Sequence, residues 1–353
     1  MVKRKYVLAS ILAVTLISWI YWSSNHEVNN TIKILSEQES FKHTIIQPSD
    51  KLCTGNPFLV IIVTSYVGHI ELRSAHRRAM PQKLLEAMNA KRVFLLAKIP
   101  EKDKIITQEA IIDESNIFGD ILQGSFVENY RNLTFKHLMG LQWASTACSN
   151  ASYILKVDDD TVFNLERTYR LLETLDANDI FLLGYILNNT KPRRNKENKW
   201  YVTREEYSRK NYPAYLSGWY YITTPKTARK ITEEAIYHPK FWIDDILITG
   251  LLTEALHIKL RQLPRDYWLE YYELLECCLR DMINKQINCD SVVGPNGGRE
   301  NLIVEFNDAI RNCDKSKKCT KRDESTPLKK VCIVNSERTI FSNGQPQVEL
   351  YQL

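Results

Sequence analysis

The hydrophobic positions of this chain form short continuous runs that alternate with segments of helical periodicity. The β-branched run "FLVIIVTSY" at 58–66 is typical of a fully buried strand, and a second strand is predicted over 91–98. Helical patterns cover 71–90, broken or restarted at its proline, and 127–148, while 153–157 is predicted to be a central strand. Buried strands that alternate with helices predict an α/β fold with a mainly parallel sheet covered on both faces.

The N-terminus has a different pattern, because residues 6–22 are an uncharged apolar run that follows three basic residues. Its length is at the short edge for a membrane-spanning helix, which suits the thinner membranes of the early secretory pathway. A cleaved signal peptide is the alternative, but the run ends in bulky aromatic residues rather than small ones. The preceding basic residues predict a cytoplasmic tail over 1–5. Residues 23–56 are polar and weakly patterned, which predicts a luminal stem before a body over 57–353.

Cysteines and glycosylation sequons agree with a luminal body. The cysteines are concentrated in the last quarter of the chain, which predicts local disulfides formed in an oxidising compartment, with a connectivity that the sequence leaves open. The eight cysteines are Cys53, Cys148, Cys277, Cys278, Cys289, Cys313, Cys319 and Cys332. N-x-S/T acceptor sequons occur at Asn29, Asn132, Asn150 and Asn188.

The charge of the chain gives no case for a nucleic-acid partner. The formal net charge of +5 is mild and spread along the sequence, whereas nucleic-acid binding needs a concentrated basic face. The polar segments 188–199 and 313–324 are interpreted as solvated surface rather than as sites.

The strand over 153–157 ends in three consecutive aspartates, Asp158, Asp159 and Asp160. A capped, solvated turn is the simplest interpretation of such a cluster. In a parallel sheet, however, ligands bind at the carboxyl ends of the strands. Carboxylates this close repel one another unless a hard divalent cation offsets their charge, and Mg²⁺ or Mn²⁺ is commonly shared between carboxylates and substrate phosphates. The triplet therefore predicts a metal site for a phosphate-bearing donor, where the metal neutralises a leaving diphosphate.

A second acidic pair, Asp244 and Asp245, lies in the apolar segment "FWIDDILITGLL" at 241–252. Apolar surroundings raise the pKa of a carboxyl group, which suits a general base near neutral pH. The alternative, weighted about evenly, is a pair that caps the following helix.

Four ordered blocks of the chain resemble one known family. The segment "FGDILQGSFVENYRNLTFKHLMGLQWASTACSNASYILKVDDDTVFN" at 118–164 closely resembles the β-1,3-galactosyltransferase and β-1,3-N-acetylglucosaminyltransferase family. The segments "YPAYLSGWYYIT" at 212–223 and "IDDILITGLL" at 243–252 are similar to two further blocks of that family. "RSAHRRAM" at 73–80 looks like a degraded form of its arginine motif, so the resemblance covers roughly 58–260.

The resemblance implies a GT-A fold and a single-pass type II protein of the Golgi membrane with a luminal catalytic domain over 57–353, of which 265–353 is divergent. It also implies a UDP-sugar donor, Mn²⁺ with Mg²⁺ as the alternative, and inversion at the anomeric carbon to give a β-1,3 linkage. UDP-galactose is slightly favoured over UDP-N-acetylglucosamine, and the acceptor is expected to be a glycoprotein or a glycolipid.

The resemblance also implies roles for individual residues. Asp160 becomes the direct metal ligand, with Asp158 and Asp159 near the ribose and the metal-bound water. Asp245 becomes the base that deprotonates the acceptor hydroxyl, with Asp244 as the fallback. Two arginines of the degraded motif are expected near the nucleotide, where guanidinium groups suit a diphosphate: they are Arg73 and Arg77.

The chain departs from the family pattern at several positions. Leu216 replaces a cysteine, and Trp219 and Tyr220 replace glycines and are expected to narrow the sugar pocket or to provide a stacking face. Family members often supply a late histidine to the metal, but no histidine follows His257, which is interpreted as a packed helix residue. Two readings stay open: a metal held by Asp160, diphosphate and water alone, or a catalytically weakened relative that binds sugars or assists another transferase.

Overall fold

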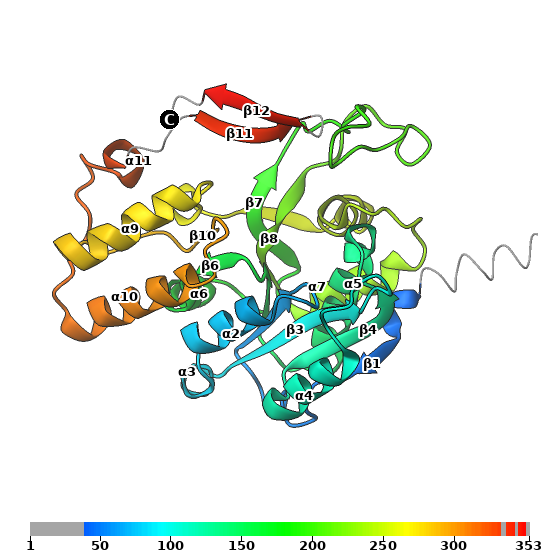
Figure 1. Ribbon diagram of the computed structural model, residues 1–353, viewed down its shortest axis with the longest axis horizontal. Helices are drawn as coiled ribbons and strands as arrows, with labels where there is room; N and C mark the ends of the chain where they lie inside the picture. The colour runs from blue at the N-terminus through cyan, green and yellow to red at the C-terminus, as the bar shows by residue number, and fades with distance from the viewer. Residues whose placement is uncertain (1–38, 333–336, 343–344, 351–353) are drawn as a thin grey trace, which may run out of the picture. The chain divides into compact units, whose positions relative to one another are not determined.

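The computed structural model describes residues 39–332, 337–342 and 345–350. Its central feature is a mixed eight-stranded sheet in the order β1-β4-β3-β2-β5-β8-β7-β9 (Figure 1). Neighbours β4, β3, β2 and β5 run parallel, as do β7 and β9, whereas β1–β4, β5–β8 and β8–β7 are antiparallel. The predicted, mainly parallel sheet is therefore confirmed, since four of its seven neighbouring pairs are parallel. The strands are β1 (Thr44–Ile46), β2 (Leu59–Thr64), β3 (Ala90–Lys98), β4 (Ile121–Val127), β5 (Tyr153–Asp158), β7 (Phe181–Leu187), β8 (Tyr215–Thr223) and β9 (Lys259–Gln262).

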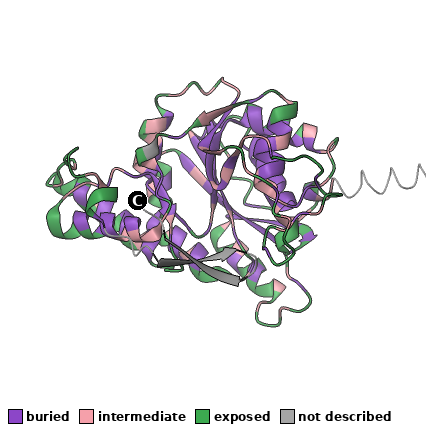
Figure 2. Cartoon of the chain, turned by 90° about the horizontal axis from the view of Figure 1, so that it is seen from above, coloured by how far each residue is buried: buried purple, intermediate pink, exposed green. Residues whose placement is uncertain are grey.

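Helices cover both faces of this sheet because its central strands are apolar on both sides. In β2, Ile61 and Val63 pack into one core with α2, α6, α9 and α10, while Val60 and Ile62 pack into a second core with α5 and α7. Figure 2 shows the buried strands between the helices. The helices that complete the two layers are α2 (Ile70–Ala79), α3 (Gln82–Ala87), α4 (Gln108–Phe118), α5 (Leu133–Thr146), α6 (Leu165–Leu172), α7 (Pro225–Ala235), α8 (Leu252–Ala255), α9 (Tyr272–Lys285) and α10 (Leu302–Ser316).

Two predicted boundaries differ from the structure. The helix predicted over 127–148 begins only at Leu133, because residues before it complete β4 and a 3₁₀ turn, η2 (Tyr130–Asn132). Residues of the predicted stem also belong to the body: β1 pairs with β4, Phe41 is buried, and Cys53 is bonded to Cys148. The compact unit therefore begins at Phe41 rather than at residue 57.

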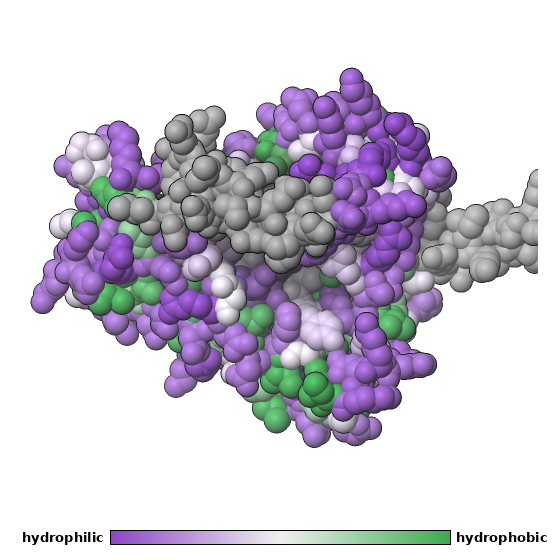
Figure 3. All heavy atoms as spheres, turned by 45° about the horizontal axis from the view of Figure 1, so that its top comes forward, coloured by the Kyte–Doolittle hydropathy of each residue, from purple (hydrophilic) through white to green (hydrophobic). Residues whose placement is uncertain are grey.

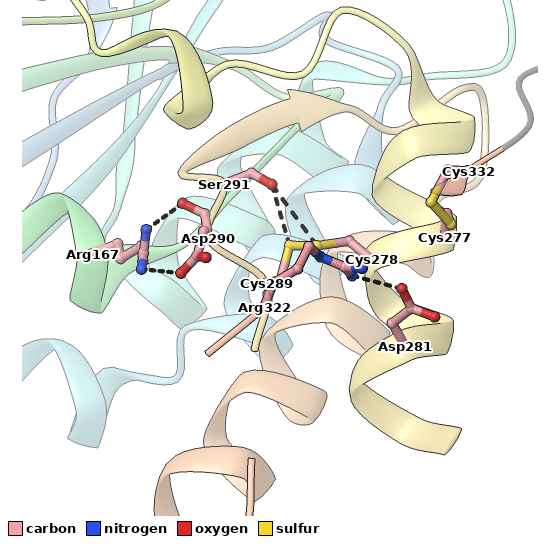
Figure 4. Close-up of a disulfide and its surroundings, with 9 residues drawn as sticks. All are labelled: Arg167, Cys277, Cys278, Asp281, Cys289, Asp290, Ser291, Arg322 and Cys332. Atoms are coloured by element: carbon pink, nitrogen blue, oxygen red, sulfur yellow. Dashed lines mark hydrogen bonds and ion pairs between the residues drawn. A yellow bond between two sulfur atoms is a disulfide. The ribbon is translucent and has the colours of Figure 1, made fainter. Parts of the chain in front are cut away.

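The divergent C-terminal part packs against the segment that follows the strand-end aspartates. Strand β10 (Val293–Pro295) pairs with β6 (Thr161–Phe163), which directly follows Asp160, and α9 and α10 flank this ribbon. Three disulfides cross-link this C-terminal part: Cys277–Cys332, Cys278–Cys289 and Cys313–Cys319. The predicted local pairing of the C-terminal cysteines is therefore confirmed. Figure 4 shows two of these bridges beside the Arg167–Asp290 and Arg322–Asp281 ion pairs. The remaining elements are a short helix, α11 (Leu328–Val331), and a hairpin of β11 (Glu337–Ser342) and β12 (Gln345–Leu350).

The surface seen in Figure 3 is mostly hydrophilic, with apolar side chains in scattered groups. Among the residues that the structure describes, no helix has the length and apolar character needed to cross a membrane. The predicted tail at 1–5, the anchor at 6–22, residues 23–38 of the predicted stem and the sequon at Asn29 lie outside those residues.

Candidate active site

One cleft of about 980 Å³ receives both acidic clusters. It opens at the carboxyl ends of β2 and β5, where the parallel sheet places its loops. The strand-end triplet (Asp158, Asp159 and Asp160) and the helix-start pair (Asp244 and Asp245) all line it. The structure thus brings together five predicted residues from segments that are far apart in the sequence.

Asp159 is the fixed member of the strand-end triplet. Its Oδ2 accepts a hydrogen bond of 2.7 Å from the hydroxyl of Ser65 and lies 2.9 Å from Nδ1 of His69. Burial would raise the pKa of Asp159, but the contacts with His69 and Ser65 outweigh it and lower that pKa below its usual value. Asp159 is therefore a carboxylate that already has its partners.

Asp158 is held by a buried lysine on the same strand. Nζ of Lys156 donates 2.5 Å to Oδ1 of Asp158 and 2.6 Å to the carbonyl of Gly218 on β8. Burial, together with the nearby Asp160, exceeds the effect of Lys156 and raises the pKa of Asp158 to about 6.

Asp160 differs from both neighbours because its carboxylate is exposed in the cleft and has no side-chain partner among the described residues. Its backbone carbonyl accepts a 2.9 Å hydrogen bond from the N–H of Asn296, just after β10. Burial by the cleft walls and the charge of Asp159 raise the pKa of Asp160. An open, oxygen-only ligand beside two more carboxylates fits a hard cation such as Mn²⁺ or Mg²⁺.

His69 is a site residue that the sequence analysis missed. It lies just before α2, lines the cleft, and its side chain is 47% exposed. Because Nδ1 contacts Asp159, Nε2 is left for a ligand, the arrangement that orients metal-binding histidines in many proteins. The cleft thus has a histidine from the N-terminal half of the chain beside the strand-end triplet, with Asp159 as the group that orients it.

The helix-start pair opens a π-helix, η3 (Asp245–Leu251), and it is not a cap. Asp244 occupies the position before this helix but makes no side-chain capping bond. Its Oδ2 instead lies 2.9 Å from Nδ1 of the fully buried His137, whose Nε2 is 2.6 Å from the hydroxyl of Tyr221. Burial would raise the pKa of Asp244, but His137 outweighs it and lowers that pKa.

Asp245 is the proton-binding member of the pair. Its Oδ2 accepts a 3.0 Å hydrogen bond from the backbone N–H of Gly218. Burial and the charge of Asp244 raise the pKa of Asp245 to about 8. A Cβ on Gly218 would lie 1.8 Å from Oδ1 of Asp245, so only glycine permits this approach.

The two arginines are not on the cleft wall. Arg73 is fully buried, forms a bidentate pair with Glu114, and donates to the hydroxyl of Ser65 and the carbonyls of residues 66 and 67. Arg77 pairs with Glu114 and Asp120. These contacts differ from the direct nucleotide contacts predicted for both side chains. Arg73 instead fixes the backbone after β2, including the residue that bonds to Asp159.

Two ionisable residues inside the apolar α5, Lys136 and His137, were also overlooked. Nζ of the buried Lys136 lies 2.6 and 2.7 Å from the carboxylate oxygens of Glu128 and donates to the carbonyl of Ser65. The adjacent His137 holds Asp244. The adjacent Lys136 and His137 could have been recognised from the sequence, because ionisable side chains buried in an apolar helix need polar partners.

The two large residues after Gly218 have separate environments. Trp219 lines the cleft and packs against Trp268, with 4.0 Å between ring centroids. Tyr220 is fully buried, and its hydroxyl is 3.0 Å from that of Thr168. The predicted stacking face therefore exists at Trp219 only.

The described sequons fall in two classes. Asn150 is exposed in a turn, and Asn188 is exposed directly after the end of β7. Asn132 is half-buried, and its side-chain amide donates to the carbonyl of Val127 and accepts from Lys240.

The cluster of Cys277, Cys332 and Asp281 is no metal site, because the two sulfurs form a disulfide.

Comparisons with known proteins identify the family of the chain. The galactosyltransferase family model matches residues 71–264. The chain is 30% identical to beta-1,3-galactosyltransferase 2 of Homo sapiens over 66% of this chain and 56% of that protein. It is 32% identical to beta-1,3-galactosyltransferase 1 of Mus musculus over 62% of this chain and 66% of that one. The match thus spans little more than half of the human relative.

Solved glycosyltransferases are similar only at a distance. The galactosyltransferase LgtC, with donor and acceptor sugar analogues, aligns over 76% of this chain and 98% of its own at 11% identity, with a TM-score of 0.37. Mouse xyloside xylosyltransferase 1 aligns over 61% and 87% at 10% identity, with a TM-score of 0.27. Both TM-scores are too low to support an argument about this chain.

Proposed function

The chain belongs to the galactosyltransferase family, and from that premise we propose that it transfers a hexose from a UDP-sugar to a hydroxyl of a glycan acceptor. The transfer is a single displacement that inverts the anomeric carbon and gives a β-1,3 linkage. The donor is UDP-galactose or UDP-N-acetylglucosamine, and the acceptor is carried by a protein or a lipid. A GT-A fold for this chain is part of the same proposal.

The observation that carries this proposal is the placement of Asp245 with a raised pKa in the same cleft as the strand-end triplet. A carboxyl with a pKa near neutrality binds a proton well enough to act as a general base. The acceptor hydroxyl gives its proton to Asp245, its oxygen forms a bond to the anomeric carbon, and the bond from that carbon to the diphosphate breaks. The diphosphate leaves with the electron pair, so no enzyme nucleophile is needed.

The remaining residues orient these groups. His137 fixes Asp244, and the negative charge of Asp244 adds to burial in raising the pKa of Asp245. Lys156 joins the triplet to Gly218, whose N–H holds Asp245, so the two clusters share one support. A shared support of this kind keeps donor and base at a fixed separation.

A divalent cation suits the strand-end triplet. Asp160 would hold it, with Asp158 and the free nitrogen of His69 as further ligands. When bound, Mn²⁺ or Mg²⁺ neutralises the charge of the leaving diphosphate. Asp159 serves by orienting His69 and needs no direct contact with the ion.

We place the protein in the Golgi membrane as a single-pass type II protein with its body in the lumen. The four disulfides and the exposed sequons at Asn150 and Asn188 support passage through an oxidising, glycosylating compartment. Occupancy of those sequons, measured by mass shift after deglycosylation, tests the luminal placement.

Turnover by the full-length chain from a secretory host tests the function. We expect transfer from a UDP-sugar to a β-galactoside or β-N-acetylglucosaminide that depends on Mn²⁺, and a product whose anomeric proton coupling reports a β linkage at oxygen 3. An α-linked product, or no consumption of any UDP-sugar, would refute the proposed reaction.

A further inference from the structure

The segment that connects β7 to β8, residues 188–214, concentrates positive charge. It carries eight Lys or Arg and three Glu, an excess of five that equals the net charge of the whole chain. The sequence analysis treated charge as spread along the chain and the first half of this segment as solvated surface. The structure instead brings part of this segment into the cleft.

The connecting segment is folded around one arginine. Arg194 donates to the carbonyls of Val202, Thr203 and Tyr207, at 2.8, 2.6 and 2.6 Å. The N–H of Tyr212 also donates to the carbonyl of Thr190 at the base of the segment. These bonds give the segment a defined shape, so the side chains at its turn have fixed directions.

Lys199 and Trp200 reach the cleft from this segment, where they meet Tyr130. Nε1 of Trp200 donates 2.9 Å to the hydroxyl of Tyr130, and Nζ of Lys199 lies 4.6 Å from the centre of the Tyr130 ring. Tyr130 and Trp200 are each 42% exposed, although large aromatic side chains are usually more buried. We call these three residues the aromatic rim.

The aromatic rim borders the helix-start pair rather than the metal side of the cleft. The ring of Tyr130 lies 5.9 Å from that of Trp242, which comes two residues before Asp244. Asp160, the exposed residue of the triplet, lies elsewhere: its neighbour Asp159 contacts His69, and its own carbonyl accepts a hydrogen bond from Asn296, just after β10. A group bound on the rim would therefore lie in the part of the cleft that borders the helix-start pair.

We propose that the aromatic rim is the acceptor subsite and that it takes a glycan with an anionic substituent, a carboxylate or a sulfate. The inference rests on the proposed function, because it assigns the acceptor for the same reaction. A pyranose ring presents an apolar C–H face that packs on the exposed indole of Trp200. The ammonium of Lys199 then pairs with the anion.

The charges left over on the connecting segment favour an anionic ligand over a neutral one. Besides Lys199, five basic side chains of this segment are exposed and make no ion pair with any described residue: Lys191, Arg193, Lys196, Arg204 and Lys210. Arg131 and Arg209 by contrast are paired with Glu206 and Glu254. Unpaired like charges on one folded segment attract an anion before contact and fix its orientation.

The test uses the full-length chain with UDP-sugar, Mn²⁺ and matched acceptors: a β-galactoside and a β-N-acetylglucosaminide, each neutral, 6-sulfated or bearing a glucuronic acid. We expect a lower KM for the anionic forms, and this advantage to shrink with added salt. Lys199→Ala is expected to raise KM about threefold for the anionic forms only. Trp200→Ala is expected to raise KM about tenfold for all forms, and Trp200→Phe to restore most of it. The sulfated and glucuronyl arms distinguish the two sources of charge.

Lys226→Ala, on the exposed face of α7, is the matched control and leaves every KM unchanged. Equal KM for neutral and anionic acceptors, or Trp200→Ala with unchanged KM, overturns the subsite while the proposed function stands. Direct titration of the sulfated galactoside in the presence of UDP and Mn²⁺ gives the same comparison as Kd values where no turnover occurs. Failure of the function and failure of the subsite are thereby distinguishable.

Discussion

The strand-end triplet and the helix-start pair line the same cleft, and each uses a histidine to fix one aspartate. His69 contacts Asp159, and His137 contacts Asp244, both at 2.9 Å. The difference lies in exposure: the side chain of His69 is 47% exposed, whereas that of His137 is fully buried. His69 can therefore contact a ligand in the cleft, whereas the buried His137 can only hold Asp244 in place.

This difference separates the chemistry of the two clusters. In the triplet, fixing Asp159 leaves Asp160 open to the cleft, which suits a cation. In the pair, burial and the negative charge of the fixed Asp244 together raise the pKa of Asp245 to about 8, which suits a proton. Two neighbouring runs of the same amino acid thus acquire separate roles from their partners.

Asp160→Ala is expected to have the largest effect on activity. Without its open carboxylate the triplet loses the ligand for the cation, and kcat falls about 10⁴-fold because the leaving diphosphate is no longer neutralised. Mn²⁺ titration in the presence of UDP should show the matching loss of affinity. Asp113→Ala, an exposed residue of α4, is the control, and full Mn²⁺ affinity in Asp160→Ala would contradict the assignment.

Asp245→Asn is expected to lower kcat about 10³-fold while Mn²⁺ affinity is kept. The same change should stabilise the fold. The folded pKa of Asp245 is raised above its unfolded value, so the carboxyl costs stability that grows as pH rises from the unfolded pKa towards about 8. Denaturant unfolding should show a larger gain for the variant at pH 8 than at pH 5. Normal turnover by Asp245→Asn would assign the base to another group.

Gly218→Ala tests the contact between β8 and the helix-start pair. The added Cβ would collide with Oδ1 of Asp245, so the carboxyl must move and kcat is expected to fall about 10²-fold. Ser217→Ala, one residue earlier, is the control with an unchanged backbone. The Mn²⁺ affinity should be retained in both variants, because neither touches Asp160.

His69→Ala sharpens the role of the exposed histidine. Loss of its free nitrogen and of its contact with Asp159 is expected to weaken Mn²⁺ binding about tenfold, as seen when the groups that orient metal ligands are removed. UDP binding without metal is the second readout and should not change. A Kd for Mn²⁺ equal to that of the parent chain would limit His69 to a structural contact.

Asp244→Asn is expected to have the smallest effect on rate and a clear effect on the pH profile. The negative charge of Asp244 raises the pKa of Asp245, so its removal lowers that pKa. Since the base must be deprotonated, the acidic limb of kcat/KM should move to lower pH. A loss of activity at every pH would instead identify Asp244 as the base.

The sequence by itself determined the α/β class, the central parallel strands and both acidic clusters. Continuous β-branched runs such as 58–66 are buried wherever they pair, so their pattern predicts a strand without knowledge of its neighbours. Charged residues that interrupt such runs are costly, which is why Asp158–Asp160 and Asp244–Asp245 stood out as functional.

Only the tertiary structure decided which side chains complete the site. Cys53 and Cys148 meet because β1 pairs with β4, and His69 meets Asp159 because β2 lies beside β5. Arg73 shows the converse: its motif predicted a ligand contact, but the fold buries it against Glu114. The local sequence pattern indicates which side chains are buried. The partner of each side chain depends on contacts between segments that are distant in the sequence, and the local pattern contains no information on those contacts.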